Sequence, residues 1–220
     1  MRDVHVPPET RGLRQPVHDH LNAWKAEYGK AIWRGPYDIA PIASLVPGGA
    51  RVLDAGCGSG KMAVPLARAG YRVVGLDLVR EGLREMQGRG IFGLAAGDVR
   101  CLPFRDGTFD AVVCYDVLQH LLEHERTMAV EEIRRVLVPE GMTFIEAFGR
   151  SDMRYGGNEV EPHTFRRETG IIYHYFSEDE MKELLSGFGS VTVKSTVTHR
   201  TFRGMKHERH RVFACGTKCP

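Results

Sequence analysis

The sequence predicts an α/β fold in which a doubly wound, mostly parallel sheet carries helices on both faces. Three observations lead to this prediction. Short apolar strands alternate with helices from residue 51 onward, a glycine-rich loop follows the first strand, and aspartates end the next two strands. Strands that alternate with helices form right-handed crossovers, which build a parallel sheet covered on both sides.

The first half of the chain begins with two predicted helices, after which strands alternate with helices. We expect helices at residues 18–28, where apolar residues recur at helical spacing, and at 37–45, before a proline–glycine break. A strand at 51–55 leads to a helix at 61–69, which Gly70 stops. A strand at 71–76 leads to a helix at 79–87, which Gly88 stops, and a strand at 91–96 follows.

The second half continues the alternation, with one interruption. We expect a strand at 111–115, a helix at 121–137 and a strand at 142–147. Residues 149–170 are predicted to be irregular. Ser177 and Glu180 form the pattern of a capping box, which predicts that a helix starts there. Strands at 191–197 and 211–215 complete the set.

Three regions are expected along the chain. Residues 1–48 form a helical extension, and residues 49–220 form the main domain. Within it, residues 149–174 follow the fifth strand and carry polar groups such as Arg154 and Tyr173. This insertion is expected to be a lid or an acceptor-binding segment, or else an ordinary polar loop. Trp33, Arg34 and Tyr37 could close the same pocket or simply pack against the core.

The composition is that of an ordinary globular protein. Of the 220 residues, 42% are hydrophobic and 26% are charged, and the formal net charge is +2. Apolar runs are too short to span a bilayer, and the N-terminus lacks the apolar segment of a secretory signal. The five cysteines are irregularly spaced, so no disulfide framework is expected. We therefore expect a cytoplasmic protein without membrane partners.

The most specific local pattern is the loop VLDAGCGSG at residues 52–60. Its three glycines stand at alternate positions in the loop that joins a strand to a helix. A ligand can approach the backbone there without a side chain in the way. The dinucleotide fingerprint G-x-G-x-x-G would need a third glycine at position 61, which is Lys61. Asp54, just before the first glycine, could accept from an ammonium group. A plain strand-to-helix turn is the alternative interpretation.

Two further aspartates end neighbouring strands. Asp77 ends the second strand, where a carboxylate can accept hydrogen bonds from both ribose hydroxyls. Asp98 ends the third, where it could accept from the exocyclic amine of adenine. Each residue taken alone could be an ordinary loop aspartate, but the preceding glycine loop favours a ligand-binding role.

Five motifs in order resemble the class I S-adenosylmethionine-dependent methyltransferases, in particular the methyltransferase type 11-like domain. They read VLDAGCGSG, GLD, GDVRCLPF, FDAVVCYDVLQHL and EEIRRVLVPEGMTFIEAFG. The resemblance covers about residues 51–149 and extends more loosely to 215. It implies a Rossmann-like methyltransferase fold, with a seven-stranded sheet whose last strand is reversed. It also implies S-adenosylmethionine as cofactor and S-adenosylhomocysteine as product.

The same resemblance implies which residues bind the cofactor. The methionine part would be held by the loop residues Asp54, Ala55, Gly56, Cys57, Gly58 and Gly60. Asp77 and Leu78 would contact the ribose, and Asp98 and Val99 the adenine. Tyr115 and Asp116 match the wall near the methionine part. The stretch from Cys114 to Val117 lacks the Asn/Asp-Pro-Pro pattern of many base-amine methyltransferases, which argues against DNA amino methylation.

Three histidines are candidate general bases, because a neutral imidazole is available near pH 7. His120 follows the fourth strand, and His163 and His174 fall in the insertion. Residues 120–124 also match the H-x-x-E-H pattern of zinc peptidases. That match lies inside a methyltransferase motif, so no metal is expected.

Three functions remain open at this level. The first is methyl transfer to a small-molecule acceptor, which we favour because no nucleic-acid module is visible. The second is methylation of RNA through a basic loop at residues 200–211, since YHYFSEDEM loosely resembles tRNA wobble-uridine methyltransferases. Those enzymes often need an activating partner protein, and a homodimer is also conceivable. The third is a non-catalytic cofactor-binding subunit.

Overall fold

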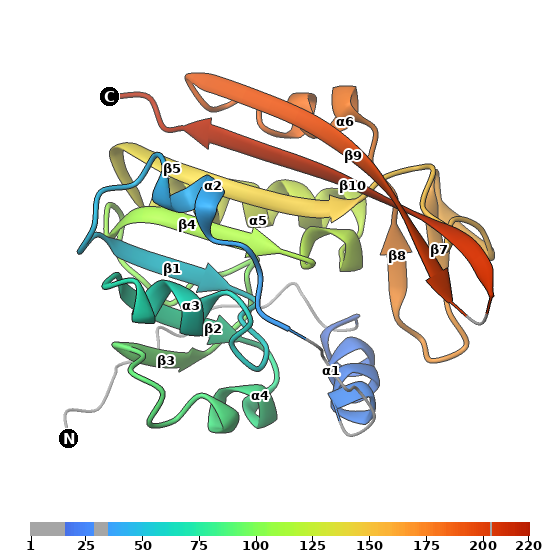
Figure 1. Cartoon of the computed structure of the whole chain (residues 1–220), viewed down its shortest axis with the longest axis horizontal. Helices are drawn as coiled ribbons and strands as arrows, with labels where there is room; N and C mark the ends of the chain where they lie inside the picture. The colour runs from blue at the N-terminus through green and yellow to red at the C-terminus, as the bar shows by residue number, and fades with distance from the viewer. Residues whose placement is uncertain (1–15, 29–34, 203) are drawn as a thin grey trace.

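The computed structural model describes residues 16–28, 35–202 and 204–220, and it confirms the predicted α/β fold class (Figure 1). Trp33 and Arg34, which we expected near the pocket, lie outside the described residues, as does Arg203 of the basic run. Of the extension at 1–48, the structure therefore describes only parts.

The main sheet has seven strands in the order β3-β2-β1-β4-β5-β10-β9. Its strands are β1 (Arg51–Ala55), β2 (Arg72–Asp77), β3 (Gly93–Ala96), β4 (Phe109–Tyr115), β5 (Leu137–Phe148), β9 (Ser190–Phe202) and β10 (Met205–Thr217). Strand β10 runs antiparallel to both of its neighbours, which confirms the reversed last strand. The chain goes outward from β1 to β3 and then returns to β4, so the topological switch point lies between β1 and β4.

Both faces of the sheet are buried. Val52 and Leu53, adjacent in β1, are each 0% exposed and belong to two different apolar clusters. Side chains alternate across a strand, so neighbouring residues can serve opposite faces. The helices of the described chain are α1 (Pro16–Tyr28), α2 (Ala40–Ala43), α3 (Ala63–Arg68), α4 (Arg80–Glu85), α5 (Glu123–Val136) and α6 (Glu178–Leu184), with a 3₁₀ turn η1 (Leu118–His120).

Several helices are shorter than predicted. The expected helix at 37–45 is reduced to α2, and the Tyr37 N–H before it donates to the Lys61 carbonyl at 3.0 Å. The expected helix at 121–137 starts at Glu123, after η1. At α6 the predicted cap is present, and the Ser177 hydroxyl accepts from the Glu180 N–H at 3.1 Å.

The prediction that residues 149–170 are irregular is wrong. A three-stranded antiparallel sheet forms from β6 (Asn158–Glu161), β7 (Thr164–Arg166) and β8 (Ile172–His174). Its strands are short and lack a clear apolar alternation, so they gave no local signal. Figure 1 shows this small sheet and α1 on the side toward which the arrowheads of β1, β2 and β4 point.

The prediction that residues 200–211 form a loop is also wrong. Strands β9 and β10 pair from Ser190↔Thr217 to Phe202↔Met205, so most of this run lies in a long hairpin. Only residues 211–217 of β10 pair with β5, and the rest of the hairpin continues past the main sheet (Figure 1). The hairpin turn contains Gly204 at φ +77°, in the left-handed region that glycine tolerates.

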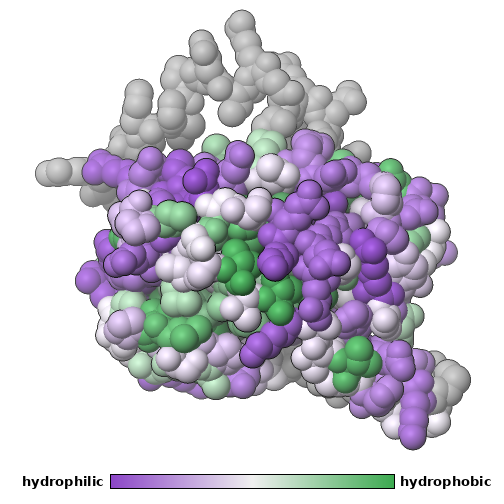
Figure 2. Space-filling model, turned by 90° about the horizontal axis from the view of Figure 1, so that it is seen from above, coloured by the Kyte–Doolittle hydropathy of each residue, from purple (hydrophilic) through white to green (hydrophobic). Residues whose placement is uncertain are grey.

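None of the helices in the described ranges is long and apolar enough to cross a membrane. Seen from above in Figure 2, hydrophilic residues cover much of the visible face, and hydrophobic residues gather at its lower left and centre.

Candidate functional site

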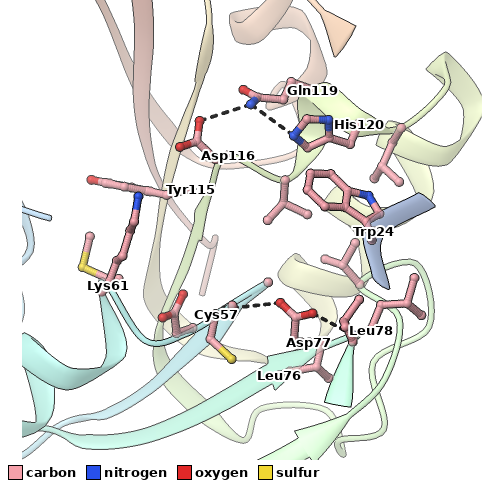
Figure 3. Close-up of a pocket in the computed structure, with 18 of the residues that line it drawn as sticks. Trp24, Cys57, Lys61, Leu76, Asp77, Leu78, Tyr115, Asp116, Gln119 and His120 are labelled. Atoms are coloured by element: carbon pink, nitrogen blue, oxygen red, sulfur yellow. Dashed lines mark hydrogen bonds between the residues drawn. The ribbon is translucent and has the colours of Figure 1, made fainter. Parts of the chain in front are cut away.

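A cavity of about 200 Å³ opens at the carboxyl ends of β1, β2 and β4 (Figure 3). Ten of the predicted cofactor residues line it, namely Asp54, Gly56, Cys57, Gly58, Asp77, Leu78, Asp98, Val99, Tyr115 and Asp116. Ala55 and Gly60 do not. Ala55 is fully buried in the core, and a Cβ on Gly60 would lie 2.6 Å from the Met86 sulfur, away from the cavity. Both residues pack beneath the loop, and their contact with the cofactor stays a prediction.

The glycine loop is held tightly against the second strand. The N–H groups of Gly56 and Cys57 both donate to the Leu76 carbonyl, at 2.7 and 2.9 Å. Gly56 has φ +86°, and a Cβ there would lie 2.2 Å from a methyl carbon of Val117. A side chain at this position would therefore be both strained and obstructed.

Asp77 joins the loop to the start of α4. Its Oδ2 accepts from the Gly58 N–H and its Oδ1 from the Val79 N–H, both at 2.8 Å. Figure 3 shows the carboxylate between these two segments at the floor of the cavity. The residue is 8% exposed and lines the cavity, so its carboxylate is oriented from both sides.

Asp54 carries a buried oxygen that faces the cavity without a partner. The side chain is 3% exposed, and Oδ2 has no hydrogen-bond partner within the described residues. Burial raises the pKa of Asp54 to about 7, against a lowering effect of the Ala63 amide, and the charge of Asp77 adds to the rise. A buried acceptor without a donor is costly, and a cation or donor placed in the cavity would relieve that cost.

Asp98 lies on the opposite wall and is oriented by Arg100. The Arg100 guanidinium donates to both carboxylate oxygens, at 2.9 Å from Nε to Oδ1 and 2.5 Å to Oδ2. Arg100 also pairs with Glu125 of α5. Val99 beside it is buried. The carboxylate therefore has a fixed position and keeps lone pairs for a further donor.

Asp116 connects three distant parts of the chain. It has φ +59° and accepts from the Tyr37 hydroxyl, from the Gln119 amide at 3.1 Å and from both terminal nitrogens of Arg211. Burial by itself would raise the pKa of Asp116, but the hydrogen bonds and charge of Arg211 outweigh it and lower the pKa to about 2. The carboxylate is thus ionised at neutral pH.

The hydrogen bonds around His120 determine its tautomer. Gln119 accepts from the Phe148 N–H at 3.0 Å, so its amide nitrogen is the atom 3.3 Å from His120 Nε2. That nitrogen is a donor, so Nε2 is the acceptor and Nδ1 donates to the Ile172 carbonyl at 2.9 Å. The side chain is 8% exposed and lines the cavity, with an unprotonated Nε2 beside Gln119 (Figure 3).

The other two candidate histidines do not line the cavity. His163 has φ +60° in the turn between β6 and β7, and its Nδ1 lies 2.7 Å from the Tyr155 hydroxyl. His174 is 1% exposed, with Nδ1 2.8 Å from the Thr164 hydroxyl and Nε2 2.7 Å from Glu180. Burial lowers the pKa of His174 in spite of that carboxylate. Of the three, His120 is the candidate base that lines the cavity, and the catalytic roles of His163 and His174 stay untested predictions.

The histidines of the H-x-x-E-H pattern lie on different elements. His120 belongs to η1 and is buried, whereas His124 belongs to α5 and is exposed. The single helix face that a zinc peptidase would need is therefore not formed. Gln119, which the sequence did not single out, lines the cavity between His120 and Asp116. Its place beside His120 in the motif is the one signal that could have indicated it.

Two arginines of the basic run point inward rather than to solvent. Arg211 pairs with Asp116 at the cavity wall, and Arg209 Nε lies 2.8 Å from the buried carboxylate of Asp152. The expectation of a basic loop free to contact phosphates is corrected for these two residues, since their charges are already paired. Lys206 remains exposed on the hairpin.

Comparisons with known proteins agree with the fold and the glycine loop. A family model described as a methyltransferase domain matches residues 53–145. A protein of Encephalitozoon cuniculi described as a methyltransferase is 33% identical over 150 residues, which cover 63% of this chain and 69% of the relative. The ubiquinone biosynthesis O-methyltransferase of Xanthomonas oryzae is 33% identical over 146 residues, covering 64% of this chain. The chain spans about half the length of that relative, 55%.

Solved structures show the same architecture. An S-adenosylmethionine-dependent methyltransferase from Methanosarcina mazei has a TM-score of 0.65 at 26% identity, covering 84% of this chain and 99% of the other. The 1,6-didemethyltoxoflavin-N1-methyltransferase of Burkholderia thailandensis, with its substrate and S-adenosylhomocysteine bound, has a TM-score of 0.68 at 20% identity, covering 99% and 94%. Together with the strand order, the glycine loop and the sequence relatives, these likenesses establish that the chain belongs to the class I S-adenosylmethionine-dependent methyltransferases.

Proposed function

We propose that this protein transfers the methyl group of S-adenosylmethionine to a small-molecule acceptor. The observation that carries the proposal is one cavity with two unlike ends. Carboxylates of Asp54, Asp77 and Asp98 line one end, and the rings of Trp24 and Tyr173 line the other. The first end suits a nucleoside with a cationic tail, and the second suits an apolar acceptor next to it.

The residues of the first end fit the cofactor. The unpartnered Oδ2 of Asp54 is placed to accept from the ammonium of the methionine part. Gly56 and Gly58 line the cavity with backbone alone, Asp77 is oriented toward the ribose, and Asp98 toward the adenine amine. When bound, the cofactor supplies an activated methyl carbon, so the protein has mainly to align the acceptor and exclude water.

His120 supplies the base at the second end. Its unprotonated Nε2 takes the proton of a hydroxyl or amine acceptor, displacing the amide of Gln119. The imidazolium that forms keeps its Nδ1–H bond to the Ile172 carbonyl, which holds the ring in place. Trp24 and Tyr173 meet the ring edge-on, with centroids at 4.7 and 4.8 Å, and limit the access of water.

The relatives' acceptors support a small molecule over RNA. The names of the Xanthomonas and Burkholderia enzymes refer to ubiquinone biosynthesis and to 1,6-didemethyltoxoflavin. The internal pairing of Arg209 and Arg211 leaves less of the basic run for phosphates.

Four expectations stay predictions from the sequence: a cytoplasmic location, an activating partner, a homodimer and the division at residue 48. Trp24 and Tyr37 of the extension do line the cavity, which ties it to the proposed site.

The direct test is binding followed by methyl transfer. In calorimetry we expect S-adenosylmethionine and S-adenosylhomocysteine to bind and NAD not to bind. With labelled cofactor, we expect label to enter fractionated small metabolites rather than RNA or protein. Binding of NAD without S-adenosylhomocysteine would refute the cofactor assignment, and label confined to RNA would refute the acceptor class.

Substitution of Asp77 should weaken cofactor binding. We expect Asp77→Ala to reduce affinity for S-adenosylhomocysteine by about 1.5–3 kcal/mol, the range for hydrogen bonds to a charged group. Because Asp77 also holds the loop, the test uses the 2′-deoxy analogue of the ligand as well. The wild type should bind the analogue more weakly than S-adenosylhomocysteine. The variant should bind the two ligands equally well. An equal penalty for the analogue in both proteins would remove Asp77 from the ribose and leave it a loop-positioning role.

A further inference from the structure

The acceptor end of the cavity, which we call the slot, is lined by flat rings. Phe148 and Tyr173 stack with centroids 6.0 Å apart and planes at 19°. His120 stands edge-on to Tyr173, and Trp24 stands edge-on to His120. All four rings line the cavity. Walls of this kind favour a planar ligand, since aromatic pairs gain from stacked and edge-to-face contacts beyond simple burial.

Arg154 lies at the exposed rim of this slot, and hydrogen bonds fix the position of its backbone. Its guanidinium carbon is 5.4 Å from the centre of the Phe148 ring. Its carbonyl accepts from the Tyr175 hydroxyl at 2.6 Å and from Arg167, and its N–H donates to Asp152 at 3.1 Å. The side chain is therefore presented to the cavity from a fixed point on the chain.

The charge of Arg154 is not neutralised by a neighbouring carboxylate. In the described part of the chain it forms no ion pair, whereas the two other arginines against the same ring do. Arg209 pairs with Asp152, and Arg211 pairs with Asp116. The nearby acids are thus already engaged, and the planar, five-donor group of Arg154 remains available to an anion that enters the slot.

We propose that the acceptor is a planar, ring-containing molecule that carries an anionic group, a carboxylate or a phosphate, which Arg154 binds at the rim. The inference rests on the proposed function, because it specifies the acceptor of that same cavity. The ring lies in the slot beside His120, and the anionic group lies outward. Arg154 is a specificity residue in this arrangement and takes no part in proton transfer.

The test measures ligand binding to the complex with S-adenosylhomocysteine by calorimetry. The probes are matched sets: 4-hydroxybenzoate, 4-hydroxyphenyl phosphate and 4-hydroxybenzamide, and indole-3-acetate with indole-3-acetamide. We expect every anionic probe to bind about tenfold or more tightly than the neutral amide of its set. The ranking of benzoate and phosphate probes distinguishes the two anion types.

Two variants assign that preference to Arg154. Arg154→Gln should reduce the anion preference to less than about threefold, while Arg154→Lys should retain part of it. Arg150→Gln is the matched control, because Arg150 lies four residues earlier, pairs with Glu180 at 3.2 Å and does not line the cavity. It should keep the full preference, and all variants should bind S-adenosylhomocysteine as the wild type does.

The outcomes separate this inference from the proposed function. If S-adenosylhomocysteine itself does not bind, the proposed function fails. If it binds but the anionic probes bind no better than the amides, or none binds, only the anionic acceptor is overturned. A preference that survives Arg154→Gln unchanged would also overturn it, because the anion site would then lie elsewhere.

Discussion

Replacing Asp116 with alanine is expected to lower the free energy of unfolding by about 2–4 kcal/mol and to reduce methyl transfer about a hundredfold or more. The carboxylate joins Tyr37, Gln119 and Arg211, and its side chain is only 20% exposed. Without it, Glu146, at 3.4 Å, is the one carboxylate among the described residues that still pairs with the guanidinium. The loss should leave Gln119 free to turn away from His120. Chemical denaturation and turnover of labelled cofactor measure the two effects.

The asparagine variant separates charge from backbone strain at this position. Asparagine tolerates the left-handed backbone that Asp116 adopts, so Asp116→Asn should lose less stability than the alanine variant. Asp110→Ala is a control, since it removes an exposed pair with Arg51 and should cost less than about 1 kcal/mol. Because the pKa of Asp116 is lowered to about 2, its stabilising effect should persist down to about pH 4 and be lost below. An alanine variant as stable as the wild type would contradict this account.

Cofactor affinity should rise with pH through the titration of Asp54. Burial raises the pKa of this carboxyl to about 7, so roughly half of the free protein carries it protonated at that pH. An ammonium group pairs with the ionised form, so the dissociation constant of S-adenosylhomocysteine should fall between about pH 6 and about pH 8. Asp54→Asn should bind about 10–100-fold more weakly at the higher pH and lose this pH dependence.

The same substitution should have the opposite effect on the stability of the free protein. The folded pKa is above the unfolded one, so the wild type binds more protons when folded and loses stability as the pH rises from about 4 to about 7. The melting temperature of Asp54→Asn should therefore improve relative to the wild type from about pH 4 to about pH 7, and the difference should stay constant above that. If the difference in melting temperature between the two proteins does not change with pH, Asp54 is not a buried titrating group.

Much of the first five strands and of the cofactor end could be predicted from the sequence. The apolar strand at 51–55, the glycines after it and Asp77 all lie close together along the chain. Such features depend on local geometry, namely strand burial and the space that glycine leaves above a turn. Their relation in the sheet then follows from the handedness of strand–helix–strand crossovers, which permits few arrangements.

The small sheet and the long hairpin could not be predicted in the same way. Strands β6, β7 and β8 contain three or four residues each and no clear alternation of apolar and polar side chains. Their stability depends on pairing with one another and on packing around Tyr175, which is 0% exposed. Pairing between strands is a tertiary property, so the same residues read singly resemble a polar loop.

The sequence by itself therefore determined the fold class, the family and ten of the residues that line the cavity, because these are carried by contiguous patterns. Only the tertiary structure decided which charged residues meet at the acceptor end. Asp116 and Arg211 are 95 residues apart, and Asp152 and Arg209 are 57 apart. An isolated arginine or aspartate has no pattern that identifies its partner, since the energy of an ion pair depends on distance and burial, which the folded chain alone establishes.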